Sequence, residues 1–74
     1  MNRMERPSSG NEARLRYLDG DYQVLRSGTF VTCAVSGLPI PLEDLRYWNV
    51  ARQEPYATAR IAMDRELAIR EGKD

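Results

Sequence analysis

Apolar and charged residues alternate along the first third of the chain, a pattern that predicts β-strands. Residues 13–17 (ARLRY) place apolar side chains on one face of an extended strand and arginines on the other. Asp19-Gly20 follows, and this dipeptide tolerates the positive φ angles of a tight hairpin turn. The alternation resumes at Tyr22, so we expect antiparallel strands at 12–18 and 21–26.

The middle of the chain is richer in strand-forming residues and is divided by turns. Residues 29–36 (TFVTCAVS) are apolar on both faces, which is typical of a covered central strand, and Ser-Gly turns bound them. Pro39 and Pro41 limit 39–42 to a short edge strand or an extended loop. Strand-forming residues return at 46–50 (RYWNV), the last strand that we expect.

The end of the chain changes to helical spacing. Pro55 suits a first helical position, and Gly72 suits a C-terminal cap. We therefore predict a helix near 55–71. Its apolar stripe consists of Tyr56, Ala59, Met63 and Leu67. Ile61 and Ile69 lie off this stripe, either as ordinary exposed residues or as part of a surface for a partner.

These elements predict an α+β fold, in which a small twisted antiparallel sheet of three to five short strands packs against one C-terminal helix. Residues 1–11 are expected to form a flexible N-terminal arm, and 12–74 a single α+β domain. The expected core residues are Leu15, Tyr17, Val24, Phe30, Val31, Cys33, Val35, Ile40, Leu45, Trp48, Val50, Tyr56, Ala59, Met63 and Leu67.

Composition narrows the class of protein. A chain of 74 residues has a thin core, and small domains often depend on a metal, a disulfide or a partner subunit. Cys33 is the only cysteine, which excludes a disulfide within the chain and fits a reducing compartment. Lys+Arg and Asp+Glu both number 11, and no long apolar run occurs. We expect a cytoplasmic protein.

Cys33 is the first candidate for chemistry. A catalytic thiol needs a base to form the thiolate, and the chain contains no histidine. We therefore expect Cys33 to be a buried structural residue, and we expect neither enzymatic activity nor a bound cofactor.

The segment 33–37 (CAVSG) has the shape of C-x-x-C-G, the knuckle that holds zinc in many small folds, with Ser36 in place of the second thiolate. In such folds a helix start supplies the other ligands, and residues 52–55 (RQEP) would occupy that position. One reading is a metal-free relative of a zinc-knuckle fold, and another is an ordinary hairpin turn. A third is a metal site shared by the Cys33 residues of two copies.

Residues 45–56 (LRYWNVARQEPY) concentrate the aromatic, arginine and amide side chains that binding hot spots use. Trp48 is expected in the core. The candidate binding surface consists of Arg46, Tyr47, Arg52, Gln53 and Glu54, with Arg14 and Arg16 on the first hairpin. Arg14, Arg16, Tyr17 and the stretch 46–52 also allow a nucleic-acid hypothesis, although Asp19 and Asp21 offset the charge of the hairpin.

Four motifs carry a resemblance to a known family: LRYLDGD, CAVSG, IPLEDLRYW and RQEPY. Over residues 12–60 the chain resembles short bacterial proteins of the domain-of-unknown-function family numbered 2093. The resemblance implies a bacterial, cytosolic, stand-alone protein and implies no activity. The leading hypothesis is a non-enzymatic module that binds a protein partner or a second copy, with a nucleic-acid accessory protein and a metal protein as alternatives. No membrane association is expected.

Overall fold

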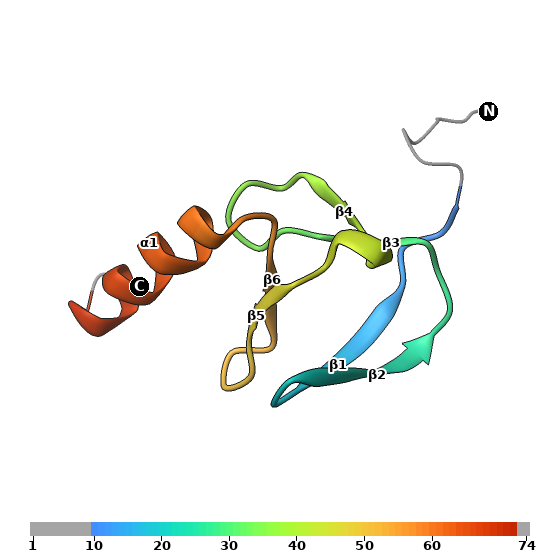
Figure 1. Ribbon diagram of the computed structural model, residues 1–74, viewed down its shortest axis with the longest axis horizontal. Helices are drawn as coiled ribbons and strands as arrows, with labels where there is room; N and C mark the ends of the chain where they lie inside the picture. The colour runs from blue at the N-terminus through green and yellow to red at the C-terminus, as the bar shows by residue number, and fades with distance from the viewer. Residues whose placement is uncertain (1–9, 73–74) are drawn as a thin grey trace.

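Residues 10–72 are described by a computed structural model, and within them the α+β class is confirmed (Figure 1). The expected N-terminal arm lies mostly outside this range. The strands pair as three separate two-stranded antiparallel ladders instead of one sheet. The elements are β1 (Arg14–Leu18), β2 (Asp21–Arg26), β3 (Phe30–Thr32), β4 (Pro39–Pro41), the 3₁₀ turn η1 (Leu42–Asp44), β5 (Tyr47–Asn49), β6 (Glu54–Tyr56) and α1 (Ala59–Arg70).

The first hairpin forms as the alternation predicts. β1 and β2 pair in register from Leu18–Asp21 to Leu15–Val24, and the register then shifts so that Arg14 lies opposite Arg26. Gly20 adopts a φ of 79° in the turn between the strands. This left-handed conformation strains any residue with a Cβ, which explains the glycine. The turn of this hairpin lies near the β5–β6 turn (Figure 1), and β2 is at the outside of the molecule, where all its residues except Tyr22 are exposed.

The predicted strand 29–36 is shorter in the structure. β3 ends at Thr32, and residues 33–37 form a tight turn that leads to β4. The Cys33 N–H donates to the Leu38 carbonyl at 2.9 Å, and the Gly37 N–H donates to the Cys33 carbonyl at 3.0 Å. Gly37 has a φ of 77°, so the Ser-Gly pair closes a knuckle and does not follow a strand.

The predicted helix start at Pro55 is wrong, because Pro55 lies in β6 and α1 begins at Ala59. Proline fits this position of β6 because a backbone N–H here would point away from β5. The N–H that proline lacks would therefore not have taken part in the β5–β6 ladder. Thr58 is the N-cap, and its hydroxyl accepts the Ile61 N–H at 3.1 Å. The predicted end is confirmed: Gly72 has a φ of 76°, and its N–H donates to the Ile69 carbonyl.

The helix docks on a different face from the one that its apolar stripe predicted. Met63 is 61% exposed and Leu67 is 45% exposed, whereas Ile61 packs against the core. Ala59 is also exposed, and Ile69 is half-buried. Polar contacts to the β5–β6 hairpin, described below, set this rotation. No residue of α1 is fully buried.

The core is small and lies where the three ladders meet. Its buried residues are Ala13, Tyr17, Phe30, Val31, Cys33, Ile40, Leu45 and Tyr56. Trp48 and Leu15 pack against it half-buried. Val24, Val35 and Val50 were expected in the core and are exposed. Val24 belongs to β2, whose residues are exposed except Tyr22, and Val35 and Val50 lie in turns, so no second layer packs on these three positions. Among the described residues, no helix has the length and apolarity needed to cross a membrane.

Candidate protein-binding groove

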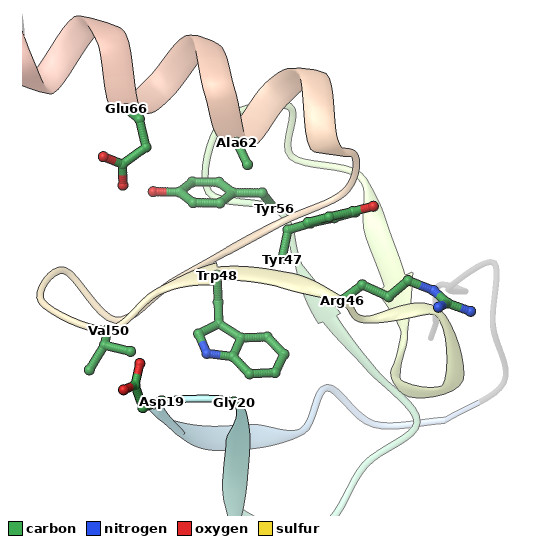
Figure 2. A pocket seen from close by; sticks show the side chains of 9 residues that line it. All are labelled: Asp19, Gly20, Arg46, Tyr47, Trp48, Val50, Tyr56, Ala62 and Glu66. Carbon is green, nitrogen blue, oxygen red and sulfur yellow. The ribbon is translucent and has the colours of Figure 1, made fainter.

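A hollow of about 400 Å³ runs along β5, between α1 on one side and the β1–β2 turn on the other (Figure 2). In Figure 2 the helix crosses the top of the view, β5 crosses the middle, and the Asp19-Gly20 turn lies below. The lining residues are Asp19, Gly20, Arg46, Tyr47, Trp48, Val50, Tyr56, Ala62 and Glu66. Three distant parts of the chain therefore build one groove.

Trp48 fixes the floor of the groove to the first hairpin. Its indole Nε1–H donates to the Leu18 carbonyl at 2.8 Å. Its ring lies 5.8 Å from the Tyr17 ring and 5.9 Å, nearly edge-on, from the Tyr22 ring. Such offset and edge-to-face pairs add to the energy of burial. The indole is thus held in one orientation and supports β5 from below.

Gln53 makes a second connection between the first hairpin and the β5–β6 hairpin. The Tyr17 N–H donates to Gln53 Oε1 at 2.9 Å, and Gln53 Nε2 donates to the Tyr17 carbonyl at 2.9 Å. Nε2 also donates to the Val50 carbonyl at 2.8 Å. The side chain therefore satisfies backbone groups of β1 that no neighbouring strand reaches. Gln53 adopts a φ of 55°, which turns its side chain toward β1.

The helix is attached to β6 by an ion pair between Glu54 and Arg65. Glu54 Oε1 accepts from the Tyr56 hydroxyl at 2.9 Å and from Arg65 Nε at 3.2 Å, and Oε2 accepts from Arg65 at 3.3 Å. The Arg65 contact lowers the Glu54 pKa despite partial burial. Burial, together with the bond to Glu54, raises the pKa of Tyr56 to about 12. The phenol is therefore a neutral donor at physiological pH.

Asn49 connects β5, the floor of the groove, to α1, which forms one wall. Asn49 Nδ2 donates to Glu66 Oε2 at 2.8 Å, and Asn49 Oδ1 accepts the Arg52 N–H at 2.8 Å. One side chain at the end of β5 thus orders the following turn and positions a carboxylate of the helix. Together with Glu54–Arg65, this contact explains why α1 docks through the Arg65 face.

The outer edge of β5 is open. Within residues 10–72, β5 pairs only with β6. Trp48 lies opposite Pro55, which has no N–H and whose carbonyl accepts the Ala34 N–H at 2.9 Å on the far side of β6. Trp48 and Pro55 are therefore a non-hydrogen-bonded pair, and the Trp48 N–H and C=O point outward along the groove.

The charges of the groove are separated along β5. Arg46 lies at the start of the strand, and Figure 2 shows its side chain at one end of the groove. Asp19 and Glu66 lie at the other end, near Val50. The groove thus has a basic end and an acidic end, with Tyr47 and Trp48 between them.

The structure divides the residues of the predicted binding surface. Arg46 and Tyr47 line the groove. Gln53 and Glu54 do not belong to a free surface, because their side chains hold the hairpins and the helix together. The remaining predicted residues lie outside the groove and are exposed. Arg14 and Arg16 are on β1, and Arg52 is in the β5–β6 turn.

Asp19, Val50 and Glu66 are groove residues that the sequence did not reveal. Asp19 was assigned to a turn and Glu66 to a helix, and only the tertiary arrangement brings them to β5. The density of aromatic residues in 45–56 was the one available signal, and it located the strand but not the walls.

The knuckle around Cys33 has the geometry of a metal-binding turn with protein groups around the sulfur. Cys33 Sγ accepts the Ser36 N–H at 3.3 Å and the Ala57 N–H at 3.4 Å. Burial raises the thiol pKa, but hydrogen bonds from Ser36, Val35 and Ala57 outweigh it, and the net pKa is lowered.

Residues 52–55 meet this knuckle differently from the prediction, which placed them at a helix start beside it. The contact is between backbones, since the Pro55 carbonyl of β6 accepts the Ala34 N–H. Ala57, two residues before α1, provides the N–H that reaches the sulfur.

Two alternative hypotheses meet structural obstacles. Cys33 is 2% exposed and its sulfur faces backbone donors, so a second copy has no access to it. Among the described residues, no three His, Cys, Asp or Glu side chains come together in a possible metal site. For nucleic acid, the obstacle concerns the first hairpin, where the Tyr17 ring beside Arg14 and Arg16 is 5% exposed, whereas Tyr47 in the stretch 46–52 is 37% exposed.

The fold and groove define a small α+β domain with a knuckle, an edge strand and a covering helix. The family described as "Uncharacterized protein conserved in bacteria (DUF2093)" matches residues 24–65, more than half of the chain. The protein belongs to this family, which confirms the resemblance inferred from the motifs. Comparisons with curated proteins and with solved structures gave no match.

Proposed function

We propose that this protein is a non-enzymatic, cytoplasmic module that binds another protein chain along β5. The observation that carries the proposal is the outward-facing backbone of Trp48 within a groove that has aromatic residues on its floor. Unpaired strand edges bind extended segments of other chains through backbone hydrogen bonds, and neighbouring side chains provide the specificity.

The side chains along this edge support the same function. Tyr47 is 37% exposed and Val50 is 42% exposed, while Arg46 lies at the end of the groove. Tyrosine, tryptophan and arginine are the residue types that dominate binding energy at protein interfaces. No covalent step is part of the proposal, and Cys33 has a structural role in it.

Retention of proteins from the native lysate, together with sedimentation, tests the proposal. The full chain is immobilised, and proteins retained by it are compared with those retained by Tyr47→Ser and by Leu25→Ser. Leu25 is an exposed apolar residue of β2 outside the groove, which makes it a matched control. We expect Tyr47→Ser to reduce retention or self-association about tenfold or more, as truncation of a hot-spot residue does. Leu25→Ser should bind like the unmodified chain.

An unmodified chain that sediments as a monomer and retains no protein would refute the proposal. If the Tyr47→Ser variant bound as well as the unmodified chain, β5 would not be the binding surface.

A further inference from the structure

We propose that the chain that pairs with β5 is a second copy of this protein, joined through antiparallel β5–β5 pairing about a two-fold axis at Trp48. The inference rests on the proposed function and adds the identity of the partner. Its basis is that this edge is complementary to a copy of itself related by a two-fold rotation. The complementarity includes the backbone groups, the charges and the exposed side chains.

The backbone positions set the register. With the axis at Trp48, its N–H and C=O exchange two hydrogen bonds with the same groups of the second copy, as in any hydrogen-bonded antiparallel pair. Arg46 then lies opposite Val50 of the second copy. The Val50 carbonyl already accepts from Gln53. Because backbone groups alternate along β5, the Val50 N–H is on the same edge as the Trp48 N–H, and in this register it donates to the Arg46 carbonyl across the axis. The result is a four-stranded sheet, β6–β5–β5–β6.

The charges agree with this register. A two-fold rotation reverses the direction of the groove, so the Arg46 end of one copy meets the Asp19 and Glu66 end of the other. Two equivalent sets of opposite charges form at the rims of the interface. A parallel arrangement would instead place arginine beside arginine. An unrelated partner would need a matching pair of charges, whereas the second copy carries them already.

The dimer also covers side chains that the monomer exposes. Tyr47 and Val50 would become enclosed between the two copies. Ala62 and Glu66, one turn apart on α1, line the groove, so this side of the helix borders the interface. The buried residues of a single copy are few, and association is one way in which domains of this size gain stability. The net charge of zero imposes no overall repulsion between copies.

A charge-exchange experiment tests the proposal. The full chain and the variants Arg46→Glu and Asp19→Arg are studied by sedimentation equilibrium from low to high concentration. We expect the unmodified chain to form a dimer and each variant alone to dimerise at least about tenfold more weakly, because like charges then meet at both rims. An equimolar mixture of the two variants should form a one-to-one heterodimer with near-normal affinity. In that mixture the glutamate introduced into one chain meets the arginine introduced into the other, and opposite charges are restored at both rims.

Arg14→Glu makes the same change of charge at the opposite end of β1 from the Asp19-Gly20 turn, and it should dimerise normally. Circular dichroism shows whether each variant is folded, and we expect all of them to be, because the altered side chains are on the surface. A monomeric unmodified chain, or variants that remain weak in the mixture, would overturn the proposal. If the monomer still retains another protein through Tyr47, the proposed function stands and only the second copy is excluded.

Discussion

The side-chain amide of Gln53 pairs with the backbone of Tyr17 as a neighbouring strand would, with two hydrogen bonds of 2.9 Å. These residues are 36 positions apart in the chain. The contact joins two hairpins that share no ladder, so a single side chain performs the work of a strand pairing. The position of the groove depends on it, because the Tyr17 strand leads directly to the Asp19-Gly20 turn.

We therefore expect Gln53→Ala to destabilise the protein by about 1–3 kcal/mol, because it leaves partly buried backbone groups of Tyr17 unpaired. Gln53→Asn is the informative control, since asparagine tolerates the positive φ but is one methylene shorter. Urea unfolding followed by circular dichroism measures both variants. If Gln53→Asn proved as stable as the unmodified protein, the amide contact would have no energetic role.

Trp48→Phe removes the indole N–H and keeps an aromatic ring. We expect a loss of about 1–2 kcal/mol, because the Leu18 carbonyl loses its donor while most of the ring packing remains. Trp48→Ala should cost more, about 3–5 kcal/mol if the site does not collapse. Thermal unfolding by circular dichroism compares the variants. A Phe variant as unstable as the Ala variant would assign the whole effect to the hydrogen bond.

The Glu54–Arg65 pair predicts a dependence of stability on pH. The folded state lowers the Glu54 pKa, so the stabilisation is present above the ordinary value of 4.5 and is lost as the pH falls through the lower, folded value. Glu54→Gln should remove this part of the acid dependence and lower stability at neutral pH. Asp64→Asn, in the exposed Arg60–Asp64 pair, should change stability by less than about 0.5 kcal/mol. Urea unfolding from about pH 3 to pH 7 distinguishes them.

The surroundings of Cys33 predict a thiol that is more acidic than usual and yet protected from reagents in solution. Its pKa is lowered by backbone donors, yet the sulfur is buried, so a thiol reagent should react only when the knuckle opens. We expect slow labelling of the native chain and much faster labelling in urea. Cys33→Ala should cost about 1–3 kcal/mol, because the N–H groups of Ser36 and Ala57 lose their acceptor. Fast labelling of the native chain would contradict this arrangement.

Local signals in the sequence located several elements well. The alternation and the Asp-Gly turn predicted β1 and β2 almost to the residue, and Gly72 predicted the end of the helix. These features depend on backbone preferences of adjacent residues, which act in any tertiary context. The stripe of Met63 and Leu67 failed, because helical periodicity shows that a face is apolar and not what covers it.

The candidate binding residues also divide into those that a local signal located and those that only tertiary packing places at the groove. Arg46 and Tyr47 were found because they belong to one dense segment, whereas Gln53 and Glu54 belong to that segment and serve the fold. Asp19 and Glu66 gave no signal, since a turn aspartate and a helical glutamate are ordinary in their own surroundings.

Local patterns in the sequence were enough to predict the α+β class, the Asp19-Gly20 turn, the end of the helix and the family. The docked face of α1, the open edge of β5 and the charges that line the groove follow from tertiary packing. The physical reason is range: turn and capping preferences act over a few residues, whereas the contacts Tyr17–Gln53, Leu18–Trp48 and Asn49–Glu66 form between segments far apart in the chain.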